Sequence, residues 1–192
     1  MLHHRWTGAA LAAALLAPCM PSQLAAQGQR LTPELLWKLR RVGEPQPSPD
    51  GGKLLYVERA YDLAANRGRS QVFLLDLRTN QRQQLTEEGS NGTPSWSPDG
   101  GSVAFVSTRS GAPQVHVLEL KSRAVRQVTT HPGGVANVVW SPTFRHVAFT
   151  AAVRLDPDLK TLYPDLPKAE ARIFDDLMIR HWDSWKDGTY SH

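Results

Sequence analysis

The chain has 192 residues, of which 41% are hydrophobic and 21% are charged, and it contains 14 glycines and 14 prolines. These values are typical of a globular protein and exclude collagen, a coiled coil and wholesale disorder. The formal net charge is +4, from 22 Lys and Arg against 18 Asp and Glu, and no run of five or six like charges occurs. We therefore expect no nucleic-acid partner.

Residues 1–26 have the pattern of a secretory signal peptide. A short positive start at Arg5 precedes an apolar, Ala-rich run over residues 7–17, and small residues end the segment at Ala26. A membrane anchor would need about 20 apolar residues, whereas this run soon meets two prolines. We expect cleavage after Ala26 and export to the periplasm or the medium, with no membrane partner beyond the export signal.

Cys19 is the only cysteine. It follows Leu16-Ala17-Pro18, which is a weak match to a lipoprotein lipidation site, because proline stands where a small residue is expected. Cleavage after Ala26 would leave the exported protein without a thiol, so packing rather than disulfides would hold its fold together.

Residues 27–42 are predicted to form a helical lead-in. Thr32 can cap a helix, Pro33 fits the first turn, and Glu34 favours the positive end of the helix dipole. Leucines follow at helical spacing. A glycine and two prolines come next, so the helix should end near Val42–Gly43.

From residue 43 onward the hydrophobic period changes to two, and turn-forming residues separate short apolar runs. This pattern indicates strands. The expected strands form two similar series, 53–59, 71–77 and 83–86, then 103–107, 114–120 and 126–129.

A short motif recurs before these strands, as PSPDG at 47–51, WSPDG at 96–100 and WSPTF at 140–144. Its serines are separated by 49 and 44 residues. A period near 45 residues with four short strands per unit is typical of a β-propeller. The motif suits a tight turn, and we expect Trp96 and Trp140 to pack between neighbouring blades.

The predicted fold class is all-β, a partial β-propeller of about three blades of four-stranded antiparallel sheet. A propeller closes with four to eight blades, so residues 43–192 hold too few units to close a ring. We therefore expect an incomplete propeller domain at the front of a longer polypeptide. Unclosed sheet edges also predict that a gene ending at His192 would give an insoluble or domain-swapped product.

The third unit departs from the repeat. Residues 151–170 contain three prolines and are predicted to be an inserted loop. Residues 169–185 carry large apolar side chains partly at helical spacing, which leaves a short helix and an irregular strand both open.

Sequence motifs for catalysis and for metal or nucleotide binding are missing. There is no G-x-S-x-G pentapeptide and no Gly-rich phosphate loop. His181, Asp183, Asp187 and His192 lack the spacing of a metal site. We therefore expect no catalytic residue, no metal and no cofactor in this chain.

Asn91-Gly92-Thr93 matches a glycosylation acceptor. Asn-Gly is also a favoured hairpin turn, and we favour the turn.

The densest group of large and charged residues lies at 175–185. Arg180, Trp182 and Asp183 are our candidate substrate contacts, because Arg and Trp are effective contact residues. In the alternative interpretation the tryptophans fill a core between blades, while Asp176 and Arg180 pair on its surface.

Several segments together resemble secreted bacterial serine peptidases of the prolyl oligopeptidase family, in particular its periplasmic dipeptidyl-peptidase type. The segments are LTPELL at 31–36, RV at 41–42, SPDG at 48–51, YPDL at 163–166 with KA at 168–169, DLM at 176–178, HWD at 181–183 and Trp185. The resemblance spans about residues 31–190, and its later part is the more specific.

The resemblance implies an N-terminal propeller over a C-terminal α/β-hydrolase domain, which carries Ser, Asp and His and is absent from this chain. It implies that the whole protein removes dipeptides through an acyl-enzyme, with a peptide substrate as partner and a propeller that restricts access and positions the peptide's amino end. None of the three catalytic residues can be assigned here, so the chain alone should be inactive. The alternative is a non-enzymatic periplasmic propeller that binds a protein or ligand, since the SPDG repeats would serve it equally.

Overall fold

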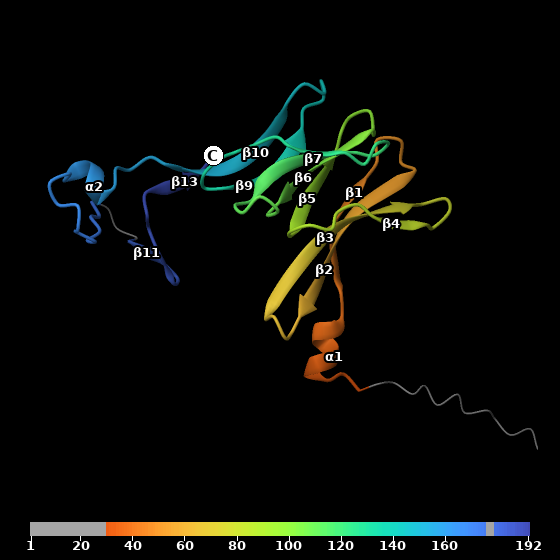
Figure 1. The fold of residues 1–192 in the computed structure, drawn as a ribbon, viewed down its shortest axis with the longest axis horizontal. Coiled ribbons are helices and arrows are strands. Elements are labelled where there is room, and N and C mark those ends of the chain that lie inside the picture. Colours follow the sequence, from red (N-terminus) through yellow and green to blue (C-terminus); the bar gives the residue numbers. More distant parts are fainter. Residues whose placement is uncertain (1–29, 176–178) are drawn as a thin grey trace, which may run out of the picture. The chain divides into compact units, whose positions relative to one another are not determined.

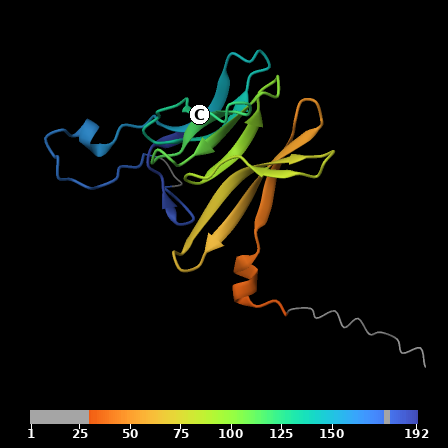
Figure 2. The same ribbon diagram turned by 45° about the vertical axis from the view of Figure 1, so that its right-hand side comes forward.

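The computed structural model describes residues 30–175 and 179–192. The predicted signal peptide and Asp176 lie outside the described residues. Pro33–His192 form one compact unit, built from antiparallel sheets that follow one another along the chain (Figure 1, Figure 2). The all-β fold class and its partial propeller are confirmed.

Each of the first two sheets has four antiparallel strands in chain order. The first contains β1 Arg41–Pro47, β2 Lys53–Asp62, β3 Arg67–Asp76 and β4 Arg82–Gln84. The second contains β5 Asn91–Trp96, β6 Ser102–Ser107, β7 Gln114–Glu119 and β8 Val125–Gln127. All six strands expected from the alternating pattern are present, with ends shifted by a few residues.

The helical lead-in is shorter than predicted. Helix α1 spans Pro33–Lys38, and β1 already begins at Arg41, so the expected helix end near Val42–Gly43 is wrong. The chain turns into strand because β1 pairs with β2 from Arg41 onward. Glycine and proline in β1 hide the strand pattern, and an edge position tolerates both.

The SPDG motif forms the turn between the first and second strands of a sheet. In the first turn Ser48 Oγ donates to Asp50 Oδ1 at 2.5 Å and accepts from the Lys53 N–H at 2.9 Å. The Gly52 N–H donates to the same carboxylate oxygen at 3.1 Å, and these bonds lower the pKa of Asp50, the serine bond most. Gly51 supplies the left-handed φ of 70° that this turn requires.

The same bonds recur 49 residues later. Ser97 Oγ donates to Asp99 Oδ1 at 2.6 Å and accepts from the Ser102 N–H at 2.8 Å. In the third turn Ser141 Oγ still accepts from the His146 N–H, at 3.2 Å. The predicted repeat is therefore a structural one.

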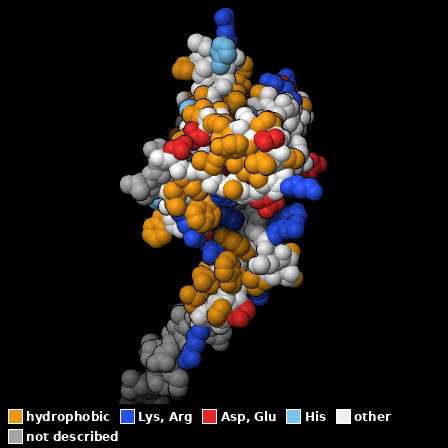
Figure 3. Space-filling view, turned by 90° about the vertical axis from the view of Figure 1, so that its left-hand side faces the viewer, with side chains coloured by type: hydrophobic (Ala, Val, Ile, Leu, Met, Phe, Trp, Pro, Cys, Tyr) orange, Lys and Arg blue, Asp and Glu red, His pale blue; other side chains and the backbone are white. Residues whose placement is uncertain are grey.

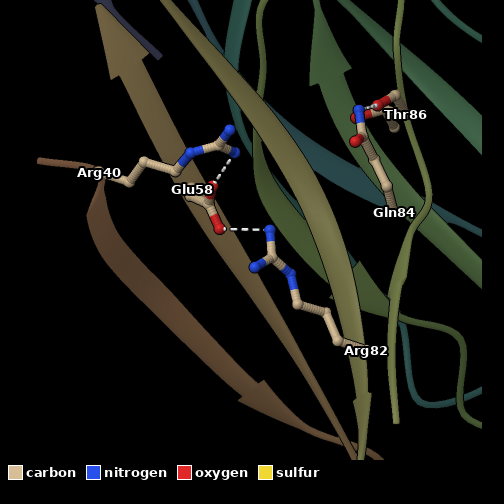
Figure 4. A network of polar contacts seen from close by, with 5 residues as sticks. All are labelled: Arg40, Glu58, Arg82, Gln84 and Thr86. Carbon is tan, nitrogen blue, oxygen red and sulfur yellow. Dashed lines mark hydrogen bonds and ion pairs between the residues drawn. The ribbon is translucent and has the colours of Figure 1, made fainter. Parts of the chain in front are cut away.

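A second repeated network, which the sequence analysis did not single out, joins the third and fourth strands. Thr86 Oγ1 donates to Gln71 Oε1 at 2.7 Å and accepts from the Val72 N–H at 2.9 Å. In the second sheet Thr129 Oγ1 makes the corresponding bonds to Gln114 and Val115, at 2.7 and 2.9 Å. Figure 4 shows the neighbouring Gln84–Thr86 bond of the first sheet.

Glu58 of β2 connects the start of the first sheet to its last strand. Its side chain is 4% exposed and pairs with Arg40, which precedes β1, and with Arg82 Nη2 of β4 at 2.7 Å (Figure 4). Buried carboxylates need such partners, because an unpaired buried charge is costly.

The core between the first two sheets is centred on Trp96, as predicted. The ring is 9% exposed and clusters with Leu55, Val72 and Phe105, which come from both sheets. Its indole N–H donates to the Gln46 carbonyl of β1 at 2.9 Å. Burial of this apolar surface drives the stacking of the sheets.

Trp140 takes the corresponding place between the second and third sheets. It packs against a cluster that contains Val115 and Val117 of the second sheet and Val135 and Val138 of the third. The predicted packing of Trp140 between sheets is confirmed.

The favoured hairpin turn at Asn91-Gly92-Thr93 is wrong. Asn91 begins strand β5 and is 1% exposed, and its side-chain amide donates to Gln71 Oε1 at 2.7 Å and to the Glu88 carbonyl at 2.9 Å. The Asn-Gly pair lies at a β-bulge between Gly92 and Ser95 rather than at a turn.

In the described chain the third sheet has three strands in the order β13–β10–β9. They are β9 Val135–Trp140, β10 Val147–Arg154 and β13 Thr189–Ser191. Residues 151–154 therefore belong to β10, and the predicted loop starts later than expected, after Arg154. Residues 155–188, which we call the arm, connect β10 to β13 and contain α2 Leu159–Leu162, β11 Arg180–His181 and β12 Ser184–Trp185.

Candidate functional site

The arm is the part of the chain that departs most from the repeat, and its two ends are tied together at the third sheet. The Leu155 N–H donates to the Gly188 carbonyl at 2.9 Å. Arg154 Nη1 donates to the Asp187 carbonyl at 2.6 Å, and Tyr190 Oη donates to Asp156 Oδ2 at 2.9 Å. The arm is therefore a long loop whose two ends are joined at the paired strands β10 and β13.

Two aspartates organise the arm locally. Asp158 caps α2 by accepting from the Thr161 N–H at 2.8 Å and the Thr161 hydroxyl at 2.7 Å. Asp187 accepts from the hydroxyl and the N–H of Thr189 at 2.6 and 3.0 Å. In both cases the threonine hydroxyl is the main cause of a lowered carboxyl pKa, so both groups are carboxylates at neutral pH.

Trp185 is the aromatic centre of the arm. Phe174 stacks on it at 6.2 Å, and the guanidinium groups of Arg172 and Arg180 lie 5.9 and 5.3 Å from its ring centre. Cation–π contacts of this kind hold arginines without neutralising them.

The structure places Arg180, Trp182 and Asp183 on the β11–β12 hairpin. Of the two conformations left open for residues 169–185, the described part forms a strand only at 180–181 and 184–185, where Arg180 pairs with Trp185 and His181 with Ser184. Residues 169–175 form neither a helix nor a strand. Trp182 is 87% exposed at the hairpin turn with a φ of 53°. Asp183 Oδ1 accepts from the Ser184 hydroxyl at 3.2 Å.

A cavity of about 390 Å³ lies within the arm, a size typical of small-ligand sites. Its charged lining residues are Arg154, Asp156, Asp158, Arg172, Asp175, Lys186 and Asp187. None of Arg180, Trp182 and Asp183 lines it, so the structure separates the predicted contact residues from this cavity. The signal that could have pointed to it is the pair of aspartates, Asp156 and Asp158, on either side of Pro157.

The cavity presents carboxylates, which suit a cation, and arginines, which suit an anion. Among the described residues, no group of three or more His, Cys, Asp and Glu side chains is placed to hold a metal ion. In the same part of the chain, no helix is long and apolar enough to cross a membrane.

The arm also exposes much apolar surface. Figure 3, viewed from the side of α2 in Figure 1, shows hydrophobic side chains gathered in the central part of this face. The exposed large apolar residues of the arm are Leu155, Leu162, Tyr163, Leu166, Ile173, Ile179, Trp182 and Trp185. Apolar patches of this kind commonly mark contact surfaces.

Comparison with known proteins agrees with this architecture. The chain is 36% identical to dipeptidyl-peptidase 5 of Porphyromonas gingivalis over 166 residues, which are 86% of this chain and 24% of that protein. It is 34% identical to the Tol-Pal system protein TolB of Alcanivorax borkumensis over 87 residues, 45% of this chain and 19% of the relative. The chain thus spans about a quarter of the length of the dipeptidyl peptidases that it matches.

Among solved structures, the chain resembles the acylaminoacyl peptidase of Pyrococcus horikoshii, with a TM-score of 0.63 and 20% identity. The match covers 81% of this chain and 23% of the peptidase, and at this identity it supports the fold alone. The expected similarity to the propeller portion of such peptidases is confirmed. Residues 36–159 match the family described as the TolB beta propeller domain, and the chain belongs to that family.

Proposed function

We propose that the chain is the N-terminal propeller segment of an exported serine exopeptidase that releases dipeptides or acylated amino acids. The observation that carries this proposal is the 36% identity to a dipeptidyl-peptidase 5 over 86% of the chain. Export is supported by the signal-peptide pattern of residues 1–26.

The propeller's role in this proposal is to restrict access to a hydrolase domain and to position the peptide substrate. Trp182, with Arg180 and Asp183 beside it, presents an exposed aromatic ring and both signs of charge on one hairpin. Trp and Arg supply much of the binding energy at contact surfaces. The carboxylates of the arm cavity would suit the charged amino group at the start of a peptide.

The test compares this chain with the complete product of its gene on dipeptidyl chromogenic substrates. We expect the complete product to hydrolyse them, a serine-directed inhibitor to abolish this activity, and the 192-residue chain to show none. Inhibitor-sensitive turnover by the chain alone, or no turnover by the complete product of either these substrates or N-acylated amino-acid substrates, would contradict the proposal.

The positioning role has its own test in the complete product. Replacing Trp182 by alanine should raise KM about tenfold, which is the loss of ~1.4 kcal/mol of binding, with little change in kcat. Lys121→Ala, on the exposed turn after β7, is the matched control and should leave KM unchanged. An unchanged KM in the Trp182 variant would assign the hairpin to another role.

A second candidate function is a propeller that binds a partner without catalysis. The TolB family match and the 34% identity to a TolB protein favour it. Reading the gene beyond residue 192 separates the two, because a G-x-S-x-G motif supports the peptidase, whereas further repeats followed by a stop codon support the binding module.

A further inference from the structure

A second cavity, of about 520 Å³, lies between the second and third sheets. Residues of β7 and β8 form one side, and the other side is the turn between β9 and β10, which carries the third copy of the SPDG motif. No residue of the arm lines this cavity, so it is separate from the candidate site described above. Its volume is typical of sites for small ligands.

The turn that borders the cavity differs from the earlier copies at the cavity itself. Where the second copy has Gly100-Gly101-Ser102, the third has Phe144-Arg145-His146. The correspondence is structural, because Ser97 and Ser141 each donate a backbone N–H to the carbonyl five residues later. All three replacements line the cavity. The third turn therefore contributes a phenyl ring, a guanidinium group and an imidazole group to the wall of this cavity.

One of these replacements, Phe144, acts against the stability of the turn. Phe144 has a φ of 64°, in the left-handed region that the other copies fill with Gly51 and Gly100, and a side chain there is unfavourable. The buried Trp140 Nε1 has no hydrogen-bond partner among residues 30–175 and 179–192, whereas Trp96 Nε1 donates to a carbonyl. Features that cost stability in this way are typical of functional positions.

The strained turn produces a flat aromatic wall. The Phe144 ring stacks on Trp140 with centres 5.2 Å apart and an interplanar angle of 14°. Phe144 remains 45% exposed, so part of this wall is open to a ligand.

The charged groups of the lining are mainly cationic. Arg126 and Arg145 both border the cavity, and neither makes an ion pair in the described part of the chain, where both ion pairs belong to Glu58. The acidic lining residue, Glu119, accepts a hydrogen bond from the Ser122 hydroxyl at 2.6 Å. Two arginines without carboxylate partners beside an aromatic wall favour an anionic ligand, since guanidinium groups match carboxylate geometry.

We propose that this cavity binds an anion that carries a flat apolar group, such as an aromatic carboxylate. The Trp140–Phe144 wall contacts the flat group, and Arg126 and Arg145 bind the carboxylate. The proposal does not depend on the peptidase function, because it uses residues outside the arm.

Isothermal titration calorimetry of the protein with N-acetyl-phenylalanine tests the proposal. N-acetyl-phenylalaninamide, which lacks the charge, and inorganic phosphate, which lacks the ring, are the comparison ligands. We expect each to bind at least tenfold more weakly than the carboxylate. Equal affinity for acid and amide, phosphate binding as tight as that of the acid, or no binding of the acid at millimolar concentration would overturn the proposal.

Variants separate loss of the site from loss of the fold. Phe144→Gly restores the residue of the other turns and removes the backbone strain, so it should fold at least as well as the parent and bind the carboxylate at least tenfold more weakly. Arg145→Gly should weaken the binding of the acid but not that of the amide. Arg69→Gln, which does not line the cavity, is the charge control and should leave the affinity unchanged. Full affinity in Phe144→Gly, or a loss in Arg69→Gln equal to that in Arg145→Gly, would contradict the assignment.

Discussion

Replacing single tryptophans by phenylalanine tests how the sheets are held together. Trp96 is 9% exposed, lies between the first two sheets and donates its indole N–H to the Gln46 carbonyl at 2.9 Å. Trp96→Phe removes this hydrogen bond, which contributes about 1 kcal/mol to stability. It also leaves a small cavity, which should lower stability by about another 1–2 kcal/mol. We therefore expect a loss of about 2–3 kcal/mol in the free energy of unfolding.

The other tryptophans provide matched comparisons. Trp140→Phe loses no hydrogen bond to the described residues, because Trp140 Nε1 has no partner there, and its cost should be about 1 kcal/mol or less. Trp182 is 87% exposed, and Trp182→Phe should stay within about 0.5 kcal/mol of the parent.

Equilibrium urea unfolding followed by far-ultraviolet circular dichroism measures these differences without relying on tryptophan fluorescence. The slopes of free energy against urea should agree among the variants, so that changes in midpoint report stability. If Trp96→Phe costs no more than Trp140→Phe, then the indole bond between the first two sheets does not contribute as described.

Three further predictions concern polar groups in the sheets. Burial is the main cause that holds the pKa of His116 below its ordinary value of 6.5. Below about pH 6.5 the unfolded chain therefore binds a proton that the folded chain resists, and the stability of the fold decreases. His116→Phe should flatten this decrease in a series of thermal melts, and an unchanged pH profile would refute the assignment. Glu58→Gln leaves two half-exposed arginines without their carboxylate partner. After allowance for solvent screening, it should lower the free energy of unfolding by about 1–2 kcal/mol, as measured by urea unfolding at low and high salt. A stability equal to that of the parent would show that the ion pairs contribute nothing. Thr129→Val removes two hydrogen bonds, and Thr86→Val removes the corresponding two in the first sheet. Each variant should therefore lower the free energy of unfolding by about 2 kcal/mol. Losses that differ widely would show that the two networks are not equivalent.

The central strands of the first two sheets can be predicted well from the sequence, because each of them forms mainly by burying apolar side chains. Strands such as β2 and β6 bury apolar side chains, and their composition shows it. The first strand of each of these sheets, which lies at the sheet edge, was harder to recognise. β1 (RVGEPQP) is exposed along its length, and β5 (NGTPSW) starts at a bulge, so neither has the alternation that marks a half-buried strand.

The arm could not be predicted in the same way because local pairing and aromatic contacts, rather than burial, give it structure. The β11–β12 hairpin rests on two residue pairs and on the contacts of Trp185. Trp182 takes a left-handed φ of 53°, which no propensity rule assigns to tryptophan. The strand β13, which closes the arm, pairs with residues more than 30 positions away, and such distant pairing leaves no periodic signal.

The most direct measurement of the central claim is mass spectrometry of the products that the complete gene product releases from an unmodified decapeptide. We expect successive dipeptides from the amino end, and we expect a serine-directed inhibitor and an acetylated amino terminus each to block their release. A decapeptide left intact after prolonged incubation in both its unmodified and its amino-terminally acetylated forms, or fragments cut only from its interior, would contradict the assignment of this propeller to an exopeptidase.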